Sequence, residues 1–178
     1  MNKIQKIVLL GLPGSGKSHL GNQLASALGF GFIDLDAQIE SREQTKISTI
    51  FSERGEAYFR KIEHEVLLDV LNQEHQSFVL ALGGGTPCFF DHMDLINAHA
   101  ISVFLDTPLQ TIAQRLSTDE VAKRPLFAGS NHGELILKLK SLLAERIYFY
   151  EQAQFKIDSA DITVEQLTAL LFDQLARN

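Results

Sequence analysis

The segment that decides the fold reads Gly11-Leu12-Pro13-Gly14-Ser15-Gly16-Lys17-Ser18, and it joins an apolar run at 6–10 to a helical pattern at 19–28. It matches the pattern G-x-x-x-x-G-K-[ST], which binds nucleotide phosphates when it lies between a strand and a helix. Its glycines let consecutive backbone N–H groups converge on the phosphates, and the helix N-terminus adds positive potential. Lys17 is expected to contact the outer phosphates and Ser18 to bind Mg²⁺. The segment predicts nucleotide binding, although binding alone does not establish catalysis.

The rest of the chain alternates apolar runs with stretches of helical spacing, which predicts an α/β fold. Strands are predicted at about 6–10, 30–35, 78–82, 101–105 and 155–157, and helices at about 19–28, up to about 42, 47–54, 56–71, 134–149 and 164–175. The spacing is too long for hairpins, and such apolar strands suit a parallel sheet covered on both faces. In such sheets ligands lie beyond the carboxyl ends of the strands.

Bulk composition limits the domain count and the partners. A chain of 178 residues with 45% hydrophobic content suits one domain over 1–178. The net charge of −6 and the pI near 5.5 argue against a nucleic-acid surface. The only cysteine, Cys88, cannot form an internal disulfide, which favours a reducing, cytoplasmic compartment. The apolar run at 7–10 is too short for a membrane span or a signal peptide.

Two carboxylates follow the second predicted strand, in Asp34-Leu35-Asp36. Alternation along a strand would place both on one face, near the phosphate loop. One of them could then serve magnesium and the other an acceptor hydroxyl. The alternative is that an aspartate caps the following helix, which is common at such junctions.

Other candidate residues lie farther along the chain. Arg60 and Glu63 share one face of a predicted helix, where a solvated ion pair is the alternative. The run Gly83-Gly84-Gly85 follows a buried strand and indicates close approach of the backbone to something, unless it is only a flexible loop. Arg124 lies in a polar segment, 117–132, which reads as a mobile lid over the transferring phosphate. An exposed, idle arginine is the alternative there.

The histidines give no metal signal. Those at 64, 75, 92, 99 and 132 lack metal-ligand spacing, and solvated positions are the expectation for them.

Six motifs taken together, in their order and approximate spacing, resemble the shikimate kinase family across nearly the whole chain. They are the phosphate loop, Asp34-x-Asp36, Phe59-Arg60-x-x-Glu63, Gly83-Gly84-Gly85, Arg124-Pro125-Leu126 and Glu145-Arg146-x-x-x-Tyr150. There are two departures from the family pattern: His19 stands where Thr is common, and Thr86–Phe90 replaces small polar residues.

The resemblance implies a three-layer P-loop kinase fold like that of nucleoside monophosphate kinases. It would have a central parallel sheet of about five strands flanked by helices, an acceptor-binding segment at about 34–63 and a lid at about 117–132. The implied reaction converts ATP and shikimate into shikimate 3-phosphate and ADP, in chorismate and aromatic amino acid biosynthesis. The resemblance also favours a monomer.

The resemblance assigns roles by position. For the acceptor, it implies Asp36 as the base, Arg60 and Arg146 on the shikimate carboxylate, and Gly84 and Gly85 in the pocket lining. For the nucleotide, it implies Gly14, Ser15, Gly16, Lys17 and Arg124 on the phosphates, His19 nearby, Arg115 by the adenine, and Ser18 with Asp34, through water, on Mg²⁺. Paired guanidinium donors suit a planar carboxylate.

Two other functions stay open on the sequence. A kinase for gluconate or a nucleoside monophosphate would use the same phosphate machinery. A non-catalytic nucleotide-binding switch is the second. The paired arginines and the glycine run disfavour the first, and the presence of Asp36 with both arginines disfavours the second.

Overall fold

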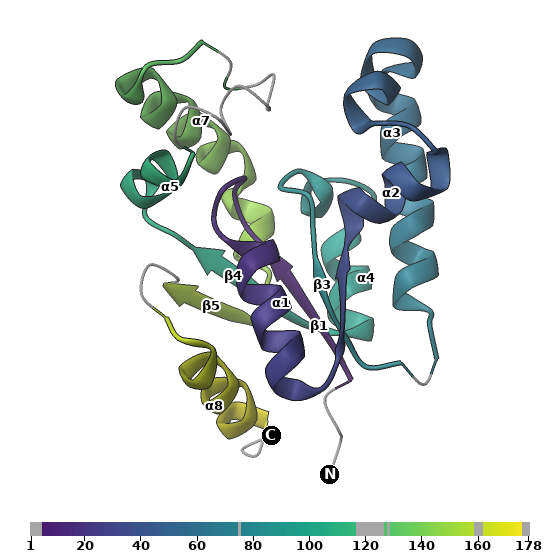
Figure 1. Cartoon of the computed structure of the whole chain (residues 1–178), viewed down its shortest axis with the longest axis vertical. Coiled ribbons are helices and arrows are strands. Elements are labelled where there is room, and N and C mark those ends of the chain that lie inside the picture. Colours follow the sequence, from purple (N-terminus) through teal and green to yellow (C-terminus); the bar gives the residue numbers. More distant parts are fainter. Residues whose placement is uncertain (1–4, 75, 117–126, 128, 159–161, 176–178) are drawn as a thin grey trace.

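The fold is built on a parallel five-stranded sheet with the strand order β2-β3-β1-β4-β5 (Figure 1). The computed structural model describes residues 5–74, 76–116, 127, 129–158 and 162–175. The strands are β1 (Lys6–Leu10), β2 (Gly31–Asp34), β3 (Phe78–Ala81), β4 (Ile101–Asp106) and β5 (Phe155–Asp158). All five predicted strands are therefore confirmed, with small shifts at their ends.

Helices cover both faces of this sheet, so the predicted three-layer architecture is confirmed. They are α1 (Lys17–Leu28), α2 (Leu35–Glu43), α3 (Ile47–Leu71), α4 (His92–His99), α5 (Leu109–Arg115), α7 (His132–Tyr150) and α8 (Val164–Leu175). Side chains alternate across β1 as strand geometry requires. Ile7 and Leu9 pack with α1 and α8, whereas Val8 and Leu10 pack with α3, α4 and α7 on the other face.

The boundaries differ from the prediction in three places. The two helices predicted on either side of Gly55 form one element, α3, with a kink at that residue. Gly55 has φ 79° and ψ 172°, which a residue with a side chain rarely adopts. The short helices α4 and α5 were not predicted, because a helix of about two turns carries too few periodic positions.

The proposed lid falls mostly outside the described residues, and so does Arg124. What is described of that segment includes the buried Phe127 and the start of α7. Asn131 caps this helix in a reciprocal capping box with Glu134.

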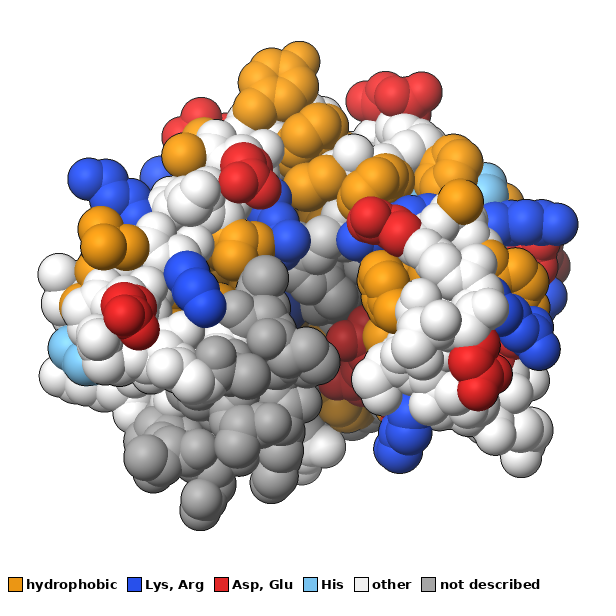
Figure 2. All heavy atoms as spheres, turned by 90° about the horizontal axis from the view of Figure 1, so that it is seen from above, with side chains coloured by type: hydrophobic (Ala, Val, Ile, Leu, Met, Phe, Trp, Pro, Cys, Tyr) orange, Lys and Arg blue, Asp and Glu red, His pale blue; other side chains and the backbone are white. Residues whose placement is uncertain are grey.

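Because every strand runs in the same direction, the carboxyl ends meet at one edge of the sheet (Figure 1). The loop after β1, the β2–α2 junction and the turn after β3 lie together at this edge. Figure 2 looks down on it and shows a hollow between the two sides of the molecule. Within the described part of the chain, no helix combines the length and apolar character needed to span a membrane.

Candidate active site

The loop between β1 and α1 forms the floor of the site. Gly16, the N-cap of α1, has φ 96°, a left-handed conformation that favours glycine. The Lys17 side chain is buried, and its Nζ donates to the carbonyls of Gly11 at 2.9 Å and Leu12 at 2.8 Å. The loop therefore holds an ammonium group inside its own curve, beside the helix N-terminus.

Two residues that follow β4 in the chain hold this loop in place. Thr107 follows β4 and donates from Oγ1 to the carbonyl of Ser15 at 3.0 Å. Arg115, at the end of α5, donates from Nη1 to the same carbonyl at 3.1 Å. Ser15 is itself 1% exposed, so its carbonyl receives two donors that fix the loop from one side.

Asp34 links the loop to the second strand. Ser18 Oγ donates to Asp34 Oδ2 at 2.8 Å, while Asp34 Oδ1 accepts from the N–H of Ala37 at 3.2 Å and caps α2. Asp34 therefore caps α2, as the alternative interpretation proposed, and its other carboxylate oxygen also binds Ser18 in the phosphate loop.

The predicted strand geometry of the two aspartates was wrong. Strand β2 ends at Asp34, and Asp36 lies in the first turn of α2 because capping by Asp34 starts the helix there. Both carboxylates nevertheless line the same pocket.

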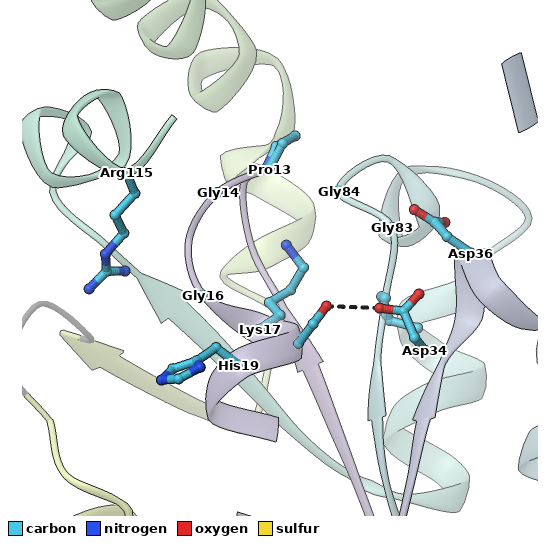
Figure 3. A pocket seen from close by; sticks show the side chains of 12 residues that line it. Pro13, Gly14, Gly16, Lys17, His19, Asp34, Asp36, Gly83, Gly84 and Arg115 are labelled. Carbon is cyan, nitrogen blue, oxygen red and sulfur yellow. Dashed lines mark hydrogen bonds between the residues drawn. The ribbon is translucent and has the colours of Figure 1, made fainter. Parts of the chain in front are cut away.

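The pocket itself has a volume of about 400 Å³. It is lined by Pro13, Gly14, Gly16, Lys17, Ser18, His19, Asp34, Asp36, Leu82, Gly83, Gly84 and Arg115. In Figure 3, Arg115 and Asp36 lie on opposite sides of Lys17, with the dashed Ser18–Asp34 bond below. A ligand that extends from Arg115 to Asp36 would therefore pass Lys17 on its way.

The turn Gly83-Gly84-Gly85 approaches three charged side chains closely. A first side-chain carbon added to Gly83 would lie 2.9 Å from Asp36 Oδ1. The same addition would lie 3.0 Å from Arg146 Nη1 at Gly84 and 3.0 Å from Arg60 Nη2 at Gly85. The predicted close approach is confirmed, and the flexible-loop alternative does not explain these contacts. The turn brings together an acid from α2, an arginine from α3 and an arginine from α7.

Arg60 is held on several sides. Its Nη1 donates to Glu63 Oε2 at 2.8 Å, and its guanidinium lies 4.0 Å from the centre of the Phe89 ring. The Glu63 side chain is 1% exposed and that of Arg60 is 14% exposed. The solvated ion pair considered for these residues is therefore wrong. Removal of either partner of such a buried pair strongly destabilises a protein, because the remaining charge is left desolvated.

Tyr150 binds the glycine turn through a hydrogen bond. Its hydroxyl donates to the carbonyl of Gly84 at 2.6 Å, and its side chain is fully buried. Burial raises the pKa of Tyr150 to about 12, against the opposing effect of the Arg146 guanidinium. The tyrosine therefore stays a neutral donor at physiological pH.

Cys88 is half-buried. Burial raises its pKa, although Arg146 and Arg60 oppose that shift, so the thiol stays protonated and unreactive.

Sequence reasoning gave no role to Thr107, Thr86 or Tyr150. Tyr150 could have been found, because it belongs to the motif Glu145-Arg146-x-x-x-Tyr150. For Thr107 and Thr86 the sequence held none, because their partners lie 92 and 23 residues away along the chain.

The oxygen atoms near Ser18 suit magnesium. A hydroxyl and a carboxylate lie within hydrogen-bond distance of each other beside the phosphate loop. Mg²⁺ prefers oxygen ligands and takes one or two carboxylates together with phosphates and water. No group of three or more His, Cys, Asp and Glu side chains fit to hold a metal occurs among the residues with described positions. This donor set fits Mg²⁺ bound together with a nucleotide.

A phosphate loop that faces a pocket with acidic and cationic side chains, on a five-stranded parallel sheet, defines a P-loop kinase. Comparison with known proteins narrows this class. The shikimate kinase family model matches residues 13–176. The chain belongs to the shikimate kinase family, whose members are ATP-dependent kinases.

Individual relatives agree with this placement. A shikimate kinase from Flavobacterium johnsoniae is 37% identical, covering 97% of this chain and 100% of the relative. A crystal structure of shikimate kinase from Bacteroides thetaiotaomicron has a TM-score of 0.88 at 34% identity, covering 98% of this chain and 99% of the other. A shikimate kinase from Acinetobacter baumannii, solved in complex with shikimate, has a TM-score of 0.82 at 32% identity, covering 98% and 93%.

Proposed function

We propose that this chain transfers the γ-phosphoryl group of ATP to the 3-hydroxyl of shikimate, giving shikimate 3-phosphate and ADP for chorismate and aromatic amino acid biosynthesis. One observation carries the assignment of roles. Asp36, Arg60 and Arg146 all lie against the turn Gly83–Gly85, and Gly83 and Gly84 of this turn also line the pocket over Lys17. A hydroxy acid bound there would have its carboxylate near the arginines and a hydroxyl near Asp36.

On the nucleotide side, the chain supplies fixed positive charge. Lys17 would exchange the carbonyls of Gly11 and Leu12 for the outer phosphate oxygens. The backbone N–H groups of the loop and the N-terminus of α1 would hold the remaining oxygens. Phosphoryl transfer has a loose transition state with charge spread over oxygen atoms, so positioning and positive charge supply most of the catalysis.

Ser18 directly, and Asp34 through water, would hold Mg²⁺. The ion, when bound, neutralises charge on the phosphate oxygens. Ser18 and Asp34 would orient their oxygens for it, because Asp34 is fixed by the capping bond from Ala37.

On the acceptor side, Asp36 would accept the hydroxyl proton and orient the attacking oxygen. Arg60 and Arg146 would each donate paired hydrogen bonds to the carboxylate, and the lack of side chains at Gly84 and Gly85 lets the two guanidinium groups approach the turn. Glu63 would keep Arg60 in place rather than compete for the substrate, since Glu63 is buried behind it.

Two further roles are part of the proposal. Arg115 would lie by the adenine, and the exposed His19 at the edge of the phosphate loop would adjust the first helical turn. Arg124 would clamp the transferring phosphate from the lid. A monomer and a cytoplasmic location remain predictions from the sequence and the family.

The test is ADP release by the purified protein with Mg²⁺ and ATP, across shikimate, gluconate, AMP and no acceptor. We expect release with shikimate alone. ADP release only with gluconate or only with AMP would mean that this compound, and not shikimate, is the acceptor. If the protein binds ATP but releases no ADP with any of these acceptors, the result would favour a non-catalytic nucleotide-binding switch.

A further inference from the structure

Behind the acceptor site lies a pair of hydrogen-bonded histidines that the proposed chemistry does not use. His64, on α3, and His92, on α4, are joined between Nδ1 and Nε2 at 2.9 Å. His92 is 0% exposed, and its Nδ1 lies 2.7 Å from the carbonyl oxygen of Thr86. The expectation that these histidines are solvated is therefore wrong for His92, because helix α4 carries it into the core.

The hydrogen-bond partners of His92 indicate which ring nitrogen donates in each bond. The Thr86 carbonyl can only accept, so Nδ1 of His92 carries the proton and donates to it. Nε2 of His92 is then an acceptor, and Nδ1–H of His64 donates to it. Both ring nitrogens of the buried histidine are thereby satisfied, which is the condition for burying such a group.

Two routes lead from His92 to Arg60. In the first, His92 holds the Thr86 carbonyl, and the Thr86 hydroxyl donates to Glu63 Oε1 at 2.6 Å. The other Glu63 oxygen accepts from Arg60 at 2.8 Å.

The second route runs through the backbone. The N–H of His92 donates to the Phe89 carbonyl at 3.0 Å, and the Phe89 ring lies 4.0 Å from the Arg60 guanidinium. This second bond is made by the main chain and is kept by any residue at position 92 except proline. The imidazole of His92 therefore acts on Arg60 through Thr86 and Glu63.

We propose that His92, supported by His64, is a positioning residue that sets the orientation of Arg60 for the acceptor carboxylate. The inference rests on the proposed function, since it takes Arg60 as a carboxylate-binding residue. Neither histidine lies among the residues of the pocket lining, so the effect of the imidazole passes through Thr86 and Glu63. Preorganised side chains bind planar anions better, because less orientational freedom is lost on binding.

The experiment compares His92→Ala with His92→Asn in steady-state kinetics with shikimate and ATP. Asparagine keeps an N–H at the place of Nδ1 and can still donate to Thr86, whereas alanine cannot. We expect His92→Ala to raise the shikimate KM about tenfold through loss of a buried hydrogen bond, with kcat and the ATP KM within about twofold of wild type. His92→Asn should restore most of the shikimate KM.

A specificity readout separates positioning from general loosening. The ratio of kcat/KM for shikimate to that for its carboxamide analogue measures recognition of the carboxylate. This ratio should fall in His92→Ala and stay near wild type in His99→Ala, which removes an exposed histidine of the same helix. Loosening of the whole fold would lower both kcat/KM values together and leave the ratio unchanged.

His64→Ala is the second variant, because His64 is only half-buried and its removal leaves the bond from His92 to Thr86 possible. His64→Ala should also raise the shikimate KM, by a smaller factor than His92→Ala. If His92→Ala does not fold, this variant tests the inference in its place. An unchanged shikimate KM in folded variants, or equal rises in the ATP and shikimate KM, would overturn the inference. A wild-type protein without shikimate turnover would instead overturn the proposed function.

Discussion

The phosphate loop and the acceptor pocket are built in different ways. The loop is one stretch, residues 11–18, and its binding groups are mostly backbone N–H groups and a helix terminus. The acceptor pocket takes its side chains from α2, α3 and α7 and joins them only at the turn after β3. A contiguous backbone site depends on its own sequence, whereas a side-chain site depends on the packing of several elements.

Removal of the loop ammonium should give the largest effect. Lys17→Met keeps an unbranched side chain of nearly the same length but removes the charge that faces the phosphates. We expect kcat/KM for both substrates to fall about a thousandfold, as for other losses of a charge-stabilising donor. Lys140→Met, at an exposed position on α7, is the control and should match wild type. A fall of less than tenfold in Lys17→Met would show that the loop works without its side chain.

Asp36→Asn tests the other side of the pocket. The amide keeps the shape but cannot take the hydroxyl proton, so turnover should fall about a hundredfold while ATP affinity stays near normal. Turnover is measured by ADP release and affinity by calorimetry. Asp94→Asn, exposed on α4, serves as the control. Normal turnover would remove Asp36 from the mechanism.

Arg146→Lys asks whether the acceptor pocket needs a planar, two-pronged donor. Lysine keeps the charge but loses the paired hydrogen bonds, so the shikimate KM should rise about tenfold with the ATP KM unchanged. Arg42→Lys tests the same exchange in an exposed pair with Glu65 and Asp69, where little effect is expected. Unchanged shikimate affinity in Arg146→Lys would count against the carboxylate role.

Tyr150→Phe should loosen the turn that joins the acceptor groups. It leaves the Gly84 carbonyl without its donor, so the free energy of unfolding should fall by about 1 kcal/mol. Denaturant unfolding measures this difference. Tyr148→Phe is the matched control, because Tyr148 lies two residues away and is 73% exposed. Equal stability of the two variants would mean that water replaces the lost donor.

The smallest effect concerns pH. Burial lowers the pKa of His92 below its ordinary value of 6.5, against the opposing effects of the Thr86 carbonyl and Glu63, while nearby His64 and Arg60 add to the lowering. As pH falls below 6.5, the unfolded chain therefore takes up a proton on His92 before the folded protein does, and the free energy of unfolding decreases.

Denaturant unfolding at pH 7.5 and pH 5.5 measures this dependence. His92→Asn should lose part of it, because the asparagine does not titrate, whereas the exposed His132→Asn should keep it. Identical pH dependence in wild type and His92→Asn would exclude a contribution from His92.

The comparison also explains which predictions succeeded. The strands were predictable because their apolar runs are local, and the loop was predictable because its motif is contiguous. The geometry of Asp36 was not, since alternation along a strand does not reveal that Asp34 ends the strand by capping α2. The burial of Glu63 and His92 was missed for a related reason. A charged or titratable residue reads as solvated until a partner from another element is known.

By itself, the sequence determined the parallel sheet, the phosphate loop and the set of residues that resembles one kinase family. Only the tertiary structure decided that Arg60 has a buried carboxylate beside it and that two histidines lie behind it. The physical reason is the range of the interactions. Periodicity and backbone conformation are set by neighbours in the chain, but burial and side-chain orientation are set by packing between elements distant in sequence.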